Sequence, residues 1–367
     1  MPEKKHLNNS KFKNIEFLRF AFSILIVMFH FRGPKATPLF YNEITPMLKG
    51  LSLCDICVDF FFIISGFFLF YSFKKHQDII DFALKRFLRL APLVWFFIIC
   101  SFILHLIINS PFTFEGNILR IFLLHNLGFG PITGGVGGHT TWFISVIFWV
   151  SLFYFYITKI FKSEHLNLII WLLTVSAYGF ILNYTNFKTG GNSTNIAFFI
   201  NSGVLRGIGG IGLGYYINML YEKKFLQNLS KKGIVFLTIL ELYCSYFLVK
   251  HLLFSNKLPG KTAFTIIIIF CVLFYLMLIQ KGLITKILNK DIFVTLGASS
   301  YAIYVTHPLI MAIFNNVILI KYNLFCEKYT LIAFIIEVLC AILFGVITHY
   351  FVEKPINKYT QKLNYSN

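Results

Sequence analysis

The chain has 367 residues, of which 57% are hydrophobic, 19% aromatic and 13% charged, and its formal net charge is +18. Such an apolar composition excludes an ordinary water-soluble domain of this length. The excess of positive charge does not indicate a nucleic-acid-binding protein, because the basic residues gather in short gaps between long apolar runs. The composition therefore predicts a polytopic membrane protein whose partners include lipids and exclude nucleic acid.

Apolar runs of about 20 residues, the length that crosses a bilayer, predict about ten membrane-spanning helices and an all-α fold. We place these helices at 15–32, 52–73, 91–109, 139–160, 166–183, 195–220, 233–253, 262–280, 297–320 and 330–351. Residues 111–138 fit neither a span nor an exposed loop and are typical of a re-entrant or interfacial segment. No cleaved signal peptide is expected, because Arg19 and His30 interrupt the first apolar run and no small-residue cleavage site follows it. We therefore expect one integral membrane domain over 1–367, with no appended soluble domain.

The orientation follows from where the lysines and arginines lie between the predicted spans. Basic residues are enriched on the cytoplasmic side of membrane proteins. Placing both termini in the cytoplasm assigns the basic residues to the inner and outer faces in a ratio of roughly two to one. We therefore expect both termini to be cytoplasmic.

The first predicted span, NIEFLRFAFSILIVMFHF, carries Glu16, Arg19, Ser23 and His30. Arg19 and His30 are eleven residues apart, and at about 100° per residue they lie within roughly 20° of one helix face. Ser23 shares that face, and Glu16 lies one turn before Arg19. Ionisable groups at membrane depth are costly and commonly line a water-filled path or a site. The span therefore predicts a polar line from Arg19, near the cytoplasmic end, to His30, near the outer end.

Asp59 enters the second predicted span from the outer side, to a depth comparable with that of His30. In one interpretation its carboxylate accepts a hydrogen bond from His30 and thereby sets the tautomer and raises the basicity of the imidazole. In the other, Asp59 caps the helix or pairs locally near the headgroups. Ser65 and Gly66, in the middle of the same span, favour a close helix contact over a nucleophile.

Two arginines, Arg86 and Arg89, lie one helical turn apart in the cytoplasmic stretch before Pro92, which we expect to open the third span. Lys85 adjoins them. One interpretation is ordinary anchoring by positive charges on the cytoplasmic side. The other is a polyphosphate ligand, because guanidinium groups bind phosphate oxygens with two hydrogen bonds.

Three further residues in apolar surroundings are candidates for contact with a ligand, and a fourth, His307, is weighed between chemistry and a bond to the backbone. Trp142 and His139, on the outer side, are candidates to face a sugar or a headgroup, although His139 also fits an ordinary interfacial histidine. Arg206, in a glycine-rich span, requires an anion or a cage of carbonyls, which either a ligand or the protein supplies. His307 precedes a proline and is positioned to bond the carbonyl that the proline leaves free.

Seven cysteines are spread through the predicted spans, an odd number that predicts no disulfide framework. Cys54 and Cys57 form a CxxC pair without a second pair, so we interpret them as small apolar residues. We expect no metal.

Five blocks in order resemble the membrane-bound acyltransferase-3 family of bacterial surface-polysaccharide and antibiotic acyltransferases. Arg19 and His30 match the family's arginine–ten residues–histidine signature, and VDFFFIISGFF matches the aspartate and Ser-Gly block. KRFLRLAPL supplies the paired arginines, and SSYAIYVTHPL and YFVEKP match two closing blocks. Two positions depart from the pattern: no glutamate follows Trp142 closely, and His139 is three residues before that tryptophan instead of two.

The resemblance implies a multi-pass protein of the bacterial cytoplasmic (inner) membrane that transfers an acyl group across it. The donor would be a cytoplasmic acyl-CoA, most often acetyl-CoA, and the acceptor a hydroxyl of a surface polysaccharide or lipid-linked glycan at the outer face. His30, Arg19 and Asp59 would then be catalytic, with His30 as the base. Arg86, Arg89 and Lys85 would bind the donor, and Trp142, His139 and Arg206 the acceptor.

Three other functions remain open. A transporter also has polar lines through its spans, but it predicts inverted internal repeats, which the sequence does not display. A non-catalytic scaffold or sensor leaves the alignment of Arg19 with His30 unexplained. An acyltransferase acting on a small molecule that is not a glycan is the third alternative.

Overall fold

The structure is a computed structural model that describes residues 12–31, 42, 44, 46–73, 78–112, 114–128, 140–185, 195–197, 200–255 and 260–363. The elements in chain order are α1 (Lys13–Phe31), η2 (Lys49–Ile56), α3 (Cys57–Phe73), α4 (Ile79–Ile107), α5 (Phe114–Ile121), α6 (Trp142–Ile160), α7 (Ser163–Phe180), η3 (Ile181–Thr185), β1 (Asn195–Ala197), β2 (Ile200–Asn201), α8 (Ser202–Glu222), α9 (Lys231–Val249), η5 (Lys250–Phe254), α10 (Gly260–Ile279), α11 (Leu283–Ile287), α12 (Ile292–Ala298), α13 (Ser300–Ile313), η6 (Phe314–Ile318), α14 (Leu319–Lys321), α15 (Asn323–Lys328), α16 (Thr330–Thr348), η7 (His349–Glu353) and α17 (Lys354–Leu363).

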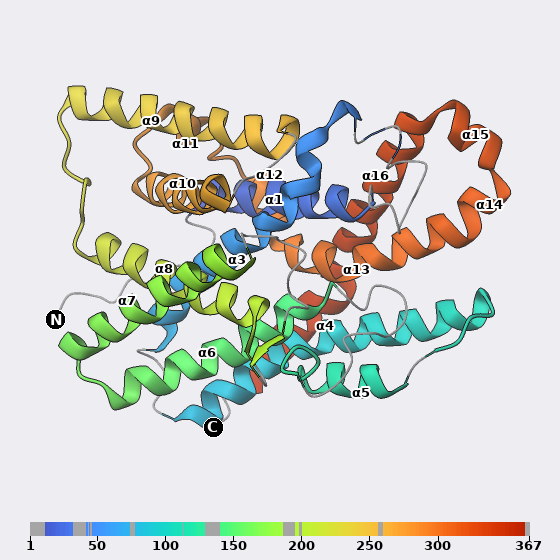
Figure 1. Ribbon diagram of the computed structural model, residues 1–367, viewed down its shortest axis with the longest axis horizontal. Helices are drawn as coiled ribbons and strands as arrows, with labels where there is room; N and C mark the ends of the chain where they lie inside the picture. The colour runs from blue at the N-terminus through green and yellow to red at the C-terminus, as the bar shows by residue number, and fades with distance from the viewer. Residues whose placement is uncertain are drawn as a thin grey trace.

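Within these ranges, nine helices are long and apolar enough to cross a membrane, which confirms the all-α polytopic class. Figure 1 shows α9 along one edge of the bundle and α4 with α5 along the opposite edge, and α3 between them. The edge helices carry exposed apolar side chains, including Phe236 and Ile239 on α9 and Ile103 on α4. In water these faces would be unfavourable, whereas in a bilayer they contact lipid chains.

The sixth predicted span, 195–220, is wrong at its start. Residues 195–197 and 200–201 form a two-stranded antiparallel ribbon, and α8 begins only at Ser202. The Asn201 side chain caps the helix by accepting a hydrogen bond from the Val204 amide at 2.9 Å. Helix α8 is not among the nine apolar helices. In the sequence of α8, glycines and Arg206 replace the large apolar side chains that the other helices carry, so α8 is less apolar than they are.

The third span is also longer than predicted. Helix α4 begins at Ile79, where the Asp78 side chain accepts hydrogen bonds from the amides of Ile80 at 2.9 Å and Asp81 at 3.1 Å. Pro92 therefore lies inside the helix and does not open it. Neighbouring helices make a proline tolerable within membrane helices. As a result, Arg86 and Arg89 belong to the same rigid helix as the apolar segment that follows them.

Helices α3 and α8 pack closely in the centre of the molecule. A Cβ atom on Gly66 of α3 would lie 2.8 Å from Ile211 Cα of α8, and one on Gly214 would lie 2.7 Å from Gly66 Cα. Only glycine permits the two backbones to approach in this way. Gly66 is therefore a helix contact, as the sequence favours. The close approach places Asp59 of α3 beside Arg206 of α8.

Candidate functional site

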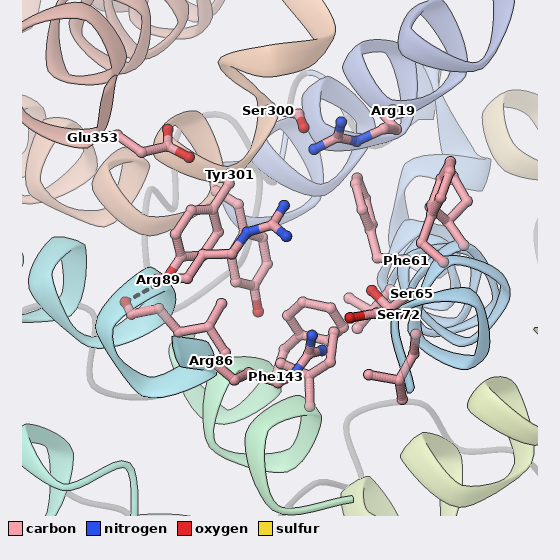
Figure 2. Close-up of a pocket in the computed structure, with 17 residues that line it drawn as sticks. Arg19, Phe61, Ser65, Ser72, Arg86, Arg89, Phe143, Ser300, Tyr301 and Glu353 are labelled. Atoms are coloured by element: carbon pink, nitrogen blue, oxygen red, sulfur yellow. Dashed lines mark hydrogen bonds between the residues drawn. The ribbon is translucent and has the colours of Figure 1, made fainter. Parts of the chain in front are cut away.

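A cavity of about 230 Å³ lies between α1, α3, α4, α6, α13 and η7. Its cationic lining consists of Arg19, Arg86 and Arg89, whose side chains converge from α1 and α4 (Figure 2). The remaining walls combine aromatic and aliphatic side chains with a few hydroxyls and one carboxylate. The principal polar members are Ser65, Ser72, Ser300, Tyr301, Tyr304 and Glu353. The structure thus brings Arg19 of the first predicted span together with the arginine pair that precedes Pro92.

The two arginines of α4 form no ion pair with any described residue. Arg89 is exposed in the cavity, Arg86 is half-buried, and the Nε atom of Arg86 is buried without a hydrogen-bond partner. Glu353 lines the same cavity, but its carboxylate bonds Nδ1 of His349 at 2.7 Å. The Tyr301 hydroxyl donates to the Leu90 carbonyl at 2.7 Å and so ties α13 to α4 beside these arginines. The pair therefore has the capacity to bind an anionic ligand.

Arg19 differs from these two because it has a carboxylate partner. Its Nη1 donates to both carboxylate oxygens of Glu16, at 3.1 and 2.9 Å, and its side chain keeps 19% of its surface exposed. Glu16, one turn earlier on α1, thus holds the guanidinium in place while Arg19 still lines the cavity. The positive charge of Arg19 is largely balanced by Glu16. Arg19 is therefore better suited to position a ligand than to bind a multiply charged phosphate.

Lys85 does not join the other basic residues of its motif. Its Nζ forms an ion pair with Asp81 at 2.7 Å, one turn earlier on α4, and it does not line the cavity. Neighbours in a helix sequence point about 100° apart, so a face that carries Arg86 and Arg89 turns Lys85 aside.

Asp59 is bound to Arg206 and not to His30, which corrects the expected Asp59–His30 pair. The Arg206 guanidinium donates to Asp59 Oδ2 from Nη2 at 2.6 Å and from Nε at 3.0 Å, and it also donates to the Asp55 carbonyl at 2.9 Å. The Tyr178 hydroxyl lies 3.4 Å from the other carboxylate oxygen. Both partners are buried. A buried carboxylate is stabilised more by a full positive charge than by a neutral ring, and α8 supplies that charge.

The structure describes two of the three residues predicted to contact the acceptor, Arg206 and Trp142, and both belong to the buried ion pair or its cover. Arg206 has the anion and the carbonyl that its position requires, both from the protein. Trp142 is buried, with its ring 5.2 Å from the Arg206 Cζ atom, so it covers the ion pair. His139 lies outside the described residues.

His30, near the end of α1, is half-buried and faces a second imidazole on α13. The ring centroids of His30 and His307 are 5.1 Å apart, with 31° between the ring planes. The His307 ring is 6.0 Å from that of Tyr304, which lines the cavity. Tyr304 therefore contacts both the cavity and the His307 ring, and Phe143, with its ring centroid 5.6 Å from that of Tyr304, lines the cavity beside it.

Sequence reasoning missed this pairing of histidines, although it described the hydrogen bond of His307 correctly. Nδ1 of His307 bonds the Tyr304 carbonyl at 2.7 Å. That carbonyl is the one that Pro308, four residues on and without an N–H, leaves free. His30 lies near the outer end of its predicted span and His307 in the middle of its own, so their positions along the chain provided no signal for the pairing.

Outside the spanning helices, two buried basic side chains, Arg120 and His125, lie at the end of α5 and in the turn after it. Burial lowers the pKa of Arg120 to about 10, and its Nη1 donates to Asn117 at 2.8 Å. Burial and the nearby charge of Arg120 lower the pKa of His125 to about 3. His125 is therefore neutral at physiological pH.

No group of three histidine, cysteine or carboxylate side chains that is suited to hold a metal occurs within the described part of the chain. The site thus offers a cationic cavity, an aromatic boundary and two imidazoles beyond it. Such a set is capable of binding an anionic group at one end and of moving a proton at the other.

The chain was compared with family models, with curated proteins and with solved structures. No curated protein and no solved structure has a significant match to it. The acyltransferase-3 model, described as an acyltransferase domain, matches residues 12–352, a stretch that includes all the helices which line the cavity except the last residue of η7. The protein therefore belongs to the acyltransferase-3 family and is a multi-pass membrane acyltransferase.

Proposed function

We propose that the protein transfers an acyl group, acetyl in the first instance, from cytoplasmic acyl-CoA to a hydroxyl of a surface polysaccharide or lipid-linked glycan. The observation that carries this proposal is the convergence of Arg19, Arg86 and Arg89 in one cavity, in which the two arginines of α4 form no ion pair. The proposal places the protein in the bacterial inner membrane with both termini in the cytoplasm, as the distribution of basic residues favours.

Arg86 and Arg89 serve as the phosphate-binding pair in this proposal. Coenzyme A carries phosphates on its nucleotide, and guanidinium groups bind phosphate oxygens through charge-assisted hydrogen bonds. The exposure of Arg89 and the unpartnered Nε of Arg86 support this role. Lys85 contributes at most to the surrounding potential, because Asp81 neutralises it.

The pantetheine arm then extends past Arg19 toward the aromatic boundary at Phe143 and Tyr304. Arg19 and His30 are separated by eleven residues, or about 16 Å of helix rise, a distance that an extended arm of this kind covers. The thioester would reach the histidines when Tyr304 or Phe143 moves aside. The acyl group would thus cross the membrane without a separate carrier.

His30 is the base of the proposed reaction. It takes the proton of the acceptor hydroxyl as that oxygen attacks the thioester carbon. The carbon–sulfur bond breaks, the proton passes to the sulfur, and the products are an ester and free coenzyme A. Asp59 supports this step from a distance, by holding α3 to α8 through Arg206, and not by contact with His30.

The test uses proteoliposomes in which one orientation of the protein is selected. Labelled acetyl-CoA is supplied on the side of Arg86 and a soluble glycan acceptor on the side of His30. We expect labelled product, and we expect His30→Ala to abolish it while the amount of protein in the membrane is unchanged. Product that forms only when both substrates share one compartment would reject transfer across the membrane.

The acceptor is identified separately by mass spectrometry of surface glycan from cells with and without the gene. A glycan lighter by one acyl group in the absence of the gene supports the proposal. An unchanged glycan, together with an acylated small molecule, would support the alternative acceptor class. Uptake of a solute without release of coenzyme A would indicate a transporter.

A further inference from the structure

We infer that His307 is a positioning residue whose Nε2 accepts a hydrogen bond from the His30 ring and so sets the tautomer in which His30 acts as base. This inference rests on the proposed function and deepens it. It assigns to α13 the orienting role that sequence reasoning gave to Asp59.

The tautomer of His307 follows from its backbone partner. A carbonyl oxygen only accepts hydrogen bonds, so Nδ1, 2.7 Å from the Tyr304 carbonyl, carries the proton. In the neutral ring Nε2 then carries the lone pair. The Pro308 ring makes this arrangement stable, because it leaves the Tyr304 carbonyl without the amide that would otherwise compete for it.

The Nε2 atom of His307 is buried and has no hydrogen-bond partner. The whole side chain is 0% exposed, so water does not replace a protein partner there. A buried polar atom without a partner costs free energy and calls for an explanation. A hydrogen bond that a rotated conformer of a neighbouring side chain completes is such an explanation.

The surroundings of this lone pair point to His30. Among the described residues, three rings are in contact with the His307 ring: His30 at 5.1 Å, Tyr304 at 6.0 Å and Phe31 at 6.1 Å between centroids. The Tyr304 hydroxyl already donates to the Thr140 carbonyl, and phenylalanine has no polar hydrogen. Of these three rings, the His30 imidazole carries the N–H that a rotation of the side chain would bring to Nε2.

This contact would act directly on the proposed chemistry. When one ring nitrogen of His30 donates to His307, its other nitrogen carries the lone pair that the acceptor hydroxyl requires. The partner also stabilises the imidazolium that forms when His30 takes the proton. The hydrogen bond requires no charge on either ring, so it forms without burying a net charge before the substrate arrives.

Two substitutions at position 307 separate the two nitrogens. In His307→Asn the side-chain amide replaces Nδ1 and preserves the bond to Tyr304, but nothing replaces Nε2. In His307→Gln the amide oxygen replaces Nε2 as an acceptor, and the bond to Tyr304 is weakened. We expect His307→Asn to lower kcat roughly 10- to 100-fold, the effect of one hydrogen bond to a charged group, with the KM for acetyl-CoA unchanged. His307→Gln is expected to retain more activity than His307→Asn, although it unfolds at a lower temperature.

Other results would overturn the inference. Wild-type kcat in His307→Asn would reduce His307 to a backbone contact. Activity in His30→Ala that disappears in both position-307 variants would make His307 the base itself. A KM effect equal to the kcat effect would place His307 in substrate binding.

A second measurement is independent of turnover and separates this inference from the proposed function. In protein labelled with ¹⁵N-histidine, NMR is expected to show His307 with its proton on Nδ1. The Nε2 resonance is expected to move in His30→Ala but not in His349→Ala, a control histidine that is bonded to Glu353. A protein that shows this shift but no acyl transfer would keep the histidine pair and reject the proposed reaction. An Nε2 resonance that is identical in His30→Ala would reject the pair, whatever the reaction.

Discussion

Arg206 and the two arginines of α4 are buried to different extents and have opposite kinds of surroundings. Arg206 is 3% exposed and has a carboxylate, a carbonyl and an indole ring around it, all from the protein. Arg86 and Arg89 face a cavity of about 230 Å³ and have no ion-pair partner among the described residues. The same residue type therefore completes one site from within the fold and leaves the other incomplete.

This difference distinguishes a structural from a ligand-binding arginine. Removing one member of a buried pair strands the other charge, so a satisfied pair is expected to determine whether the helices stay together. Unpaired cations that converge on a cavity repel one another. They therefore do not stabilise the packing of the helices that carry them. Their arrangement is explained if an anion from outside the chain joins them.

The largest effect is predicted for the paired site. Arg206→Ala is expected to destabilise the protein by about 3–5 kcal/mol, because Asp59 becomes a buried charge without a charged partner. The measurement is the thermal unfolding and the yield of detergent-purified protein.

The double variant Asp59→Ala with Arg206→Ala serves as the control for this prediction. Removing both charges avoids the stranded carboxylate, so we expect it to be more stable than Arg206→Ala alone. Equal stability of the single and double variants would contradict the assignment of this pair to the packing of α3 against α8.

A smaller effect, on binding and not on folding, is predicted at the cavity. Arg86→Ala and Arg89→Ala are each expected to weaken acetyl-CoA binding roughly 10- to 100-fold, the contribution of one hydrogen bond to a charged group. The unfolding temperature should change little, since neither arginine has an ion-pair partner among the described residues. Isothermal titration calorimetry on purified protein measures the affinity.

Lys85→Ala is the matched control on the same helix. Lys85 adjoins Arg86 in the sequence, but it pairs with Asp81 and does not line the cavity. Its substitution should leave the affinity close to that of the wild type. A loss as large as that of Arg86→Ala would show that the general positive potential, and not the cavity, attracts the donor.

The contrast also explains how much of the site was predictable from the sequence. Spacing along one helix is local information, so Arg19 and His30 on α1, and Arg86 and Arg89 on one face of α4, were placed correctly. The lengths of the apolar runs predicted the fold class correctly, because they too are local information. Pro92 was misinterpreted as a helix start because its neighbours in the bundle, which make it tolerable inside α4, are not visible in the sequence.

Contacts between helices were much less predictable. Asp59 and Arg206 are 147 positions apart, and nothing in either segment shows that α3 and α8 touch at that depth. The glycines of α8 indicated a close approach to some helix without showing which one. The facing of His30 and His307 was missed on the same ground, since each histidine was assessed only within its own span.

The smallest effect is predicted at a third kind of basic site, the end of α5 and the turn after it, where Arg120 bonds a neutral amide and His125 is 4% exposed. Burial and the charge of Arg120 lower the pKa of His125 from its usual 6.5 to about 3. The unfolded chain therefore takes up a proton near pH 6.5, whereas the folded chain does so only near pH 3. The stability contributed by neutral His125 is complete above pH 6.5 and is lost progressively as the pH falls toward 3.

Between pH 7.5 and 5.0 this loss amounts to about 2 kcal/mol, at 1.36 kcal/mol for each pH unit below 6.5. Thermal unfolding of purified protein at the two pH values measures it. His125→Gln keeps a polar side chain that does not titrate, so its unfolding temperature should fall less at pH 5.0 than that of the wild type. His165→Gln, at an exposed position of α7, should behave as the wild type does. If His125→Gln loses as much stability between pH 7.5 and 5.0 as the wild type, His125 is not the group responsible for the loss. Burial of a neutral histidine would then not set this site apart from the two arginine sites.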